Sequence, residues 1–149
     1  MSTAAYRKMK KNKLEIEYSY DFDLVGLTTS ARAYKLAWEL NQRLRIRLLK
    51  KPDLSIPTRT KDKEEATYSL HVHETAHNVL RLFRNKPNEA QLSRFLLVPE
   101  YPHMDYIIMI QGEELDSNRL QEDLRAIPSI EWVAFIPLEP LKSKDNFIF

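Results

Sequence analysis

The sequence has no cysteine and only two glycines, Gly26 and Gly112, among its 149 residues. Without cysteine there are no disulfides, thiol nucleophiles or cysteine-ligated metal centres, and this composition is typical of a reducing compartment. Two isolated glycines exclude a glycine-rich phosphate loop, a dinucleotide-binding fingerprint and a nucleophile elbow. We therefore expect a cytoplasmic protein that uses none of these common catalytic designs.

Long hydrophobic runs are also missing. The longest, such as IIMI and FLLV, have the length of strands, far short of the roughly 20 apolar residues that a membrane-spanning helix needs. The basic stretch MSTAAYRKMKKNK is followed by LEIEYSYDFDLV, in which acidic residues interrupt every apolar stretch, so we expect no signal peptide. These features predict a soluble chain without a membrane association.

The overall charge does not indicate a type of binding partner, because 23 basic residues are balanced by 21 acidic ones. Two local basic clusters stand out, one near the N-terminus and one after the first predicted helix. A solvated tail and a solvated helix end explain both, and contacts with RNA phosphates are the alternative. The candidate RNA contacts are Arg7, Lys8, Lys10, Lys11, Arg43, Arg45 and Arg47.

Hydrophobic periodicity predicts the domain organisation and the secondary structure. We expect a flexible basic arm at 1–12, a single domain at 13–138 and a C-terminal tail at 139–149. Spacings of three and four residues predict helices at 31–44 and at 115–127. The apolar face expected for the first helix comprises Ala33, Tyr34, Ala37, Trp38, Leu40 and Leu44. The runs typical of strands are 14–18, 66–74, 78–85, 94–100, 105–111 and 129–137, whereas 20–30 is expected to be irregular and 48–65 an exposed loop.

The connections between these strands suggest how they pair. Short connections favour antiparallel neighbours, and the stretch from 105 to 137 is long enough for a helical crossover between two parallel strands. We therefore predict an α+β fold, with a mostly antiparallel sheet of about five to six strands and two main helices on one face.

Three of the four histidines fall in the segment SLHVHETAH. On a strand, His71 and His73 point to the same face and are the candidate ligands of a metal, with His77 and Glu74 nearby. The alternative is that both are the polar, outward face of a half-buried strand. No second cluster with ligand spacing supports a metal, so we expect none and predict no cofactor.

The segment LVPEYPHMDY offers two carboxylates, Glu100 and Asp105, on either side of His103. They are candidates for an acid and base pair around a small substrate. The structural alternative is a connection between strands, in which Pro99 and Pro102 end the pairing and the carboxylates accept backbone N–H groups. We assign no catalytic residue.

The same segment carries a resemblance to a known family. Val98-Pro99-Glu100, three further residues and Met104-Asp105-Tyr106 resemble the signature of the IPExxxVDY family of small bacterial proteins, with Val98 in place of Ile and Met104 in place of Val. The resemblance extends over about residues 10–137. It implies a bacterial single-domain protein and draws attention to Pro99, Glu100, Asp105 and Tyr106 as a possible recognition surface, but it implies no reaction.

Three functions are consistent with these observations. The one we favour is a non-catalytic module that binds a partner protein or a second copy of itself through a sheet edge or through the motif surface. An RNA- or ribosome-associated protein is the alternative, and a small metal- or carboxylate-dependent enzyme is the third.

Overall fold

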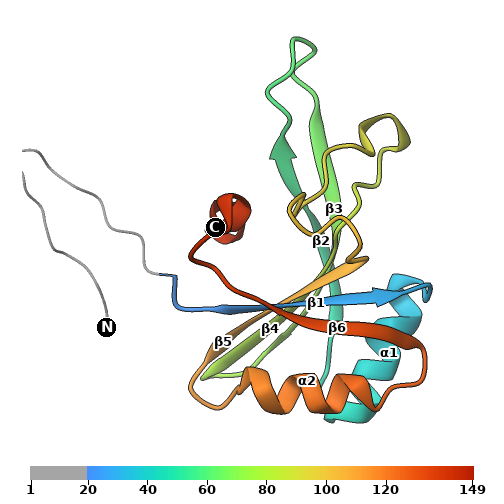
Figure 1. Ribbon diagram of the computed structural model, residues 1–149, viewed down its shortest axis with the longest axis vertical. Coiled ribbons are helices and arrows are strands. Elements are labelled where there is room, and N and C mark those ends of the chain that lie inside the picture. Colours follow the sequence, from blue (N-terminus) through green and yellow to red (C-terminus); the bar gives the residue numbers. More distant parts are fainter. Residues whose placement is uncertain (1–19) are drawn as a thin grey trace, which may run out of the picture.

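The computed structural model describes residues 20–149, and within them it confirms the α+β fold: a six-stranded sheet in the order β2-β3-β4-β5-β1-β6, with antiparallel pairing throughout. Helices α1 and α2 lie on the same side of this sheet (Figure 1). The strands are β1 (Asp23–Thr29), β2 (Leu49–Pro57), β3 (Glu65–Glu74), β4 (Asn78–Arg84), β5 (Tyr106–Gly112) and β6 (Ile130–Ile136); the helices are α1 (Ala33–Leu44) and α2 (Ser117–Arg125), with short 3₁₀ helices η1 (Ala90–Leu92) and η2 (Lys142–Phe147). None of the helices in this part of the chain has the length and apolar character needed to cross a membrane.

The helix-covered face of the sheet holds one half of the core. Helix α1 buries Leu36, Ala37 and Leu40 there, at the spacing of one helical face. Our expectation for the two aromatic residues was wrong, because Tyr34 is 70% exposed and Trp38 is 58% exposed. Leu36, rather than the aromatics, completes the buried stripe, and the rings lie on the solvent side of the helix.

The opposite face is covered by chain without a long helix. The segment between β4 and β5 packs there, together with η2, which Figure 1 shows on the side of the sheet away from α1 and α2. Phe147 of η2 is fully buried and meets the Phe83 ring edge-on at 5.4 Å between ring centroids. Residues 139–149, separated above as a tail, thus contribute Leu141 and Phe147 to this second core.

Strand β1 lies where we expected irregular chain. It is flanked by β5 and β6 and is buried on both faces, so its residues form a continuous apolar run rather than an alternating one. A Cβ at Gly26 would lie 2.7 Å from Cγ of Met104, so the close packing of the motif segment against β1 needs glycine there. The strand predicted at 14–18 lies outside the described residues.

Strand β2 lies where we expected an exposed loop. It is an edge strand whose residues are mostly exposed, and it carries Lys50, Lys51 and Pro52 next to a bulge. Charge, proline and a bulge are the features that protect a sheet edge, and in a sequence they look the same as a loop. The β2–β3 hairpin projects beyond the rest of the sheet (Figure 1).

Two further expectations about strands were wrong. Residues 94–100 form no strand, because β4 pairs directly with β5 and the apolar residues Leu97 and Val98 are instead buried under tight turns. The crossover through α2 does not pair β5 with β6, since β1 lies between them and is antiparallel to both.

Candidate functional site

The motif segment is a series of turns organised by one buried side chain that sequence reasoning missed, Asn85. Its amide donates to the carbonyls of Met104 at 2.8 Å and Tyr101 at 3.2 Å, and its Oδ1 accepts from the N–H of Val98 at 2.7 Å. Asn85 is 1% exposed, and its backbone also bonds to Leu97 and Asp105. One amide therefore closes the loop that connects β4 to β5.

Glu100 attaches this loop to the C-terminal segment. Its Oε2 accepts the N–H groups of Lys142 at 2.6 Å and Ser143 at 3.0 Å, and its Oε1 accepts the Ser143 hydroxyl at 2.7 Å. Burial alone raises the pKa of Glu100, but the hydrogen bonds from Ser143 and Lys142 outweigh burial and the pKa is lowered. The carboxylate accepts backbone donors, as one of our alternatives proposed, although these donors are distant in sequence.

Asp105 and Tyr106 connect the motif to the start of α1. Asp105 Oδ2 accepts the N–H of Thr29 at 2.9 Å, and the Tyr106 hydroxyl donates to the carbonyl of Ala31 at 2.7 Å. Burial raises the pKa of Tyr106, so the phenol remains a donor in this bond. Glu100 and Asp105 thus serve different segments, and no hydrogen bond joins the two carboxylates in the described part of the chain.

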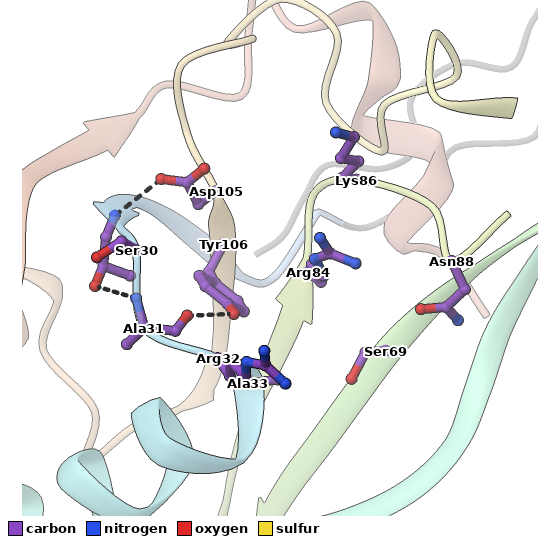
Figure 2. A pocket seen from close by; sticks show the side chains of 11 residues that line it. Ser30, Ala31, Arg32, Ala33, Ser69, Arg84, Lys86, Asn88, Asp105 and Tyr106 are labelled. Carbon is purple, nitrogen blue, oxygen red and sulfur yellow. Dashed lines mark hydrogen bonds between the residues drawn. The ribbon is translucent and has the colours of Figure 1, made fainter. Parts of the chain in front are cut away.

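Asp105 and Tyr106 also line a cavity of about 610 Å³ at the start of α1. Figure 2 shows Tyr106 at one side, Arg84 beside it, Lys86 and Arg32 on either side of Arg84, and Ser69 and Asn88 across the opening. Three cationic side chains therefore surround this space. They come from two parts of the chain: Arg32 directly precedes α1, and Arg84 and Lys86 lie at and just after the end of β4. The remaining lining residues are Thr29, Ser30, Ala31 and Ala33.

The two edges of the sheet differ in how they meet solvent. At the β2 edge, Lys50 forms an ion pair with Asp53 at 2.7 Å beside Pro52 and the bulge. At the β6 edge, the strand IEWVAFI has one charged residue, Glu131, and exposes Trp132 to 63% and Phe135 to 41%. The first edge has the usual protection against pairing with another chain. The second has neither lysine, proline nor a bulge of this kind, and within the described part of the chain its one side-chain cover is Arg125, which donates to the Val133 carbonyl at 3.4 Å.

The candidate metal ligands lie in different surroundings from those we expected. His71 is not on an outward face: it is 7% exposed on the helix-covered side, and its Nδ1 has no hydrogen-bond partner. Burial lowers the pKa of His71, and Lys50 lowers it further. The Nδ1 of His73 accepts the backbone N–H of Arg47 at 3.0 Å. Between residues 20 and 149, no group of three or more histidine, aspartate or glutamate side chains is arranged to hold a metal.

The candidate RNA contacts are separated by the structure. Arg7, Lys8, Lys10 and Lys11 lie outside the described residues. Arg43 pairs with Asp123 of α2 at 3.6 Å, while Arg45 ends α1 in a left-handed conformation with a φ of 56°. Arg47 is exposed just beyond it, so these three arginines lie at the end of α1 remote from the cavity.

The cationic residues of the cavity were not singled out from the sequence. Arg32 is far from the other two in the sequence, and Arg84 and Lys86, separated by Asn85, are too few to form a charge run. The available signal was the position of Arg84 and Lys86 at the end of a predicted strand, close to the motif in the fold but not in the sequence.

Comparisons with known proteins identified no similar protein. A scan against protein-family models, a search of curated proteins and a search of solved structures each returned no match to this chain. The IPExxxVDY resemblance therefore remains a prediction, and the functional argument depends on the geometry alone.

Proposed function

We propose that this protein is a non-catalytic interaction module that associates with a second copy of itself through the edge of β6. The observation that carries the proposal is the contrast between the two sheet edges. Strand β6 has neither lysine nor proline, and its Trp132 and Phe135 are exposed, whereas β2 has lysines, a proline and a bulge. A weakly protected edge offers backbone donors and acceptors to another strand, and exposed aromatic rings add apolar contact area. Strand pairing at Val133 would displace Arg125 from the Val133 carbonyl, to which it donates at 3.4 Å.

The sequence of β6 is compatible with a copy of itself. In an antiparallel pair related by a two-fold axis at Val133, the central residue of the strand, Glu131 of one copy would lie opposite Phe135 of the other, and Trp132 opposite Ala134. The single charge of the strand would then face an apolar residue, so no like charges meet. The net charge of only +2 also allows two copies to approach without strong repulsion.

Measuring mass in solution tests this proposal. Light scattering on a sizing column is expected to give a dimer for the wild type and a monomer for Phe135→Lys, because a lysine at an edge opposes strand pairing. Leu49→Lys on the protected edge is the matched control, since Leu49 is similarly exposed at 47% and the dimer is expected to persist. Because association raises the melting temperature of a dimer, the two variants are compared at a protein concentration low enough for both to be monomers. Equal melting temperatures there would show that Phe135→Lys acts on association and not on folding.

A monomeric wild-type protein that also captures no specific protein from its own lysate would refute the interaction module. Nuclease treatment during that capture separates it from the RNA-associated alternative, in which the captured material depends on nucleic acid and binding weakens steeply with salt. We further propose a bacterial cytoplasmic location, supported by the lack of cysteine and by the motif resemblance.

A further inference from the structure

We propose that the cavity at the start of α1 binds a phosphorylated small molecule of about mononucleotide size. The proposal goes beyond the interaction role and depends on a different part of the molecule. It starts from the three cationic side chains around the cavity, because the fold brings Arg32 next to Arg84 and Lys86 from a distant part of the chain.

These three cations have no anionic partner in the protein as described. Over residues 20–149, no carboxylate oxygen lies within the 4.0 Å of an ion pair from any of them, although lysine and arginine form such pairs elsewhere, as in Lys50 with Asp53. Asp105 is the one carboxylate lining the cavity, and its Oδ2 already accepts from Thr29. Three formal positive charges therefore surround the space against one negative charge.

Such an arrangement favours an anion with several acceptor oxygens. Gathered cations repel one another, and a bound dianion converts this repulsion into attraction. Arginine guanidinium groups match phosphate oxygens in a planar, two-pronged geometry, and lysine adds a point charge. The hydroxyl groups of Ser30 and Ser69 line the same space and supply uncharged hydrogen-bonding groups, whereas the amide of Asn88 already donates to Asp53 and Thr67.

The volume of the cavity and its uncharged lining residues indicate a ligand larger than a free phosphate ion. Its volume of about 610 Å³ lies within the range of pockets for organic ligands, roughly 300–1,000 Å³. The Tyr106 side chain is only 4% exposed and is held by its hydrogen bond to the Ala31 carbonyl, so it forms a fixed part of the cavity wall beside Arg84 and offers little ring surface to a ligand. A phosphate near the cations and a sugar or other polar group beside Ser30 and Ser69 would use both parts of the cavity.

Thermal-shift and calorimetric titrations with adenosine monophosphate, ribose 5-phosphate and inorganic phosphate test the proposal. We expect saturable binding of the phosphate monoesters, a raised melting temperature, and weaker binding of inorganic phosphate. For Arg84→Gln we expect affinity to fall about tenfold or more, because a charge-assisted hydrogen bond contributes at least this factor. Arg47→Gln, which removes an exposed arginine at the far end of α1, is expected to leave affinity unchanged.

Three results would overturn the proposal. The first is the absence of saturable binding of either phosphate monoester by the wild type. The second is equal affinity in the Arg84→Gln and wild-type proteins, with both melting at the same temperature without ligand. The third is binding of a single-stranded RNA oligonucleotide that phosphate monoesters do not displace and that Arg47→Gln weakens more than Arg84→Gln.

Discussion

Replacing Asn85 by alanine removes the side chain that closes the motif loop. Asn85 is 1% exposed and makes three side-chain hydrogen bonds, one accepted from the N–H of Val98 and two donated to the carbonyls of Tyr101 and Met104. Alanine leaves all three backbone groups without this partner. Because these groups lie on both sides of Pro99 and Glu100, the substitution loosens the whole connection between β4 and β5.

The expected loss of stability follows from these bonds. A buried N–H without an acceptor costs about 1–3 kcal/mol, and each lost donation to a carbonyl costs about 0.5–1.5 kcal/mol. The carbonyls retain access to a second partner more easily than the Val98 N–H does, and neighbouring bonds are not additive. We therefore expect the free energy of unfolding to fall by about 2–4 kcal/mol, which lowers the melting temperature by about 5–15 °C.

Urea denaturation measures this change, with an unaltered dependence on urea concentration as the sign that the folded state is intact. Asn88→Ala is the matched control, because Asn88 is exposed and donates to Asp53 and Thr67 at the surface, so a loss below about 1 kcal/mol is expected. If Asn85→Ala destabilised the protein no more than Asn88→Ala, the amide would not organise the loop and our account of the motif would be wrong.

Three further predictions concern the neighbouring carboxylates and the buried histidine. Asp105→Ala is expected to lower the free energy of unfolding by about 1–3 kcal/mol, because it leaves the buried Thr29 N–H without an acceptor. Asp105→Asn keeps an acceptor and should lower it less. Equal losses for the two variants in chemical denaturation would contradict this. The pKa of Glu100 is lowered on folding, so its contribution to stability is present above about pH 4.5 and is lost as the pH falls below that value. With Glu100→Gln, the free energy of unfolding should depend less on pH in this acidic range. Because the pKa of His71 is lowered in the folded protein, the unfolded chain binds a proton at a higher pH than the folded protein does, so the free energy of unfolding should decline as the pH falls below about 6.5. His71→Phe should remove that decline, whereas His77→Phe, at an exposed position, should not.

Local patterns in the sequence were sufficient for the helices and for several strands. Helix α2, with Asp116 accepting from the N–H of Asn118 at its start, was predicted from its spacing and its capping residue. Strands β3, β4, β5 and β6 were predicted because apolar runs of strand length were separated by short connections. These features depend on residues that are close together in the sequence, and a sequence pattern describes only such local relationships.

The motif residues show both the value and the limit of a local pattern. Glu100 and Asp105 were expected to accept backbone donors, and they do, but from residues 142–143 and from Thr29 and not from their own turn. The pattern indicated the chemistry of the carboxylates. It contained no information on which distant N–H groups the fold would bring to them.

The sequence by itself determined the α+β composition, the positions of both helices and the lack of cysteine and glycine motifs that excludes several chemistries. Only the tertiary structure decided the strand order, the burial of β1 between two antiparallel neighbours, the exposure of β6 and the meeting of Arg32, Arg84 and Lys86 around one cavity. The physical reason is that strand order and cavities depend on contacts between residues far apart in the chain, where burial of the whole core, and not local preference, selects the pairing.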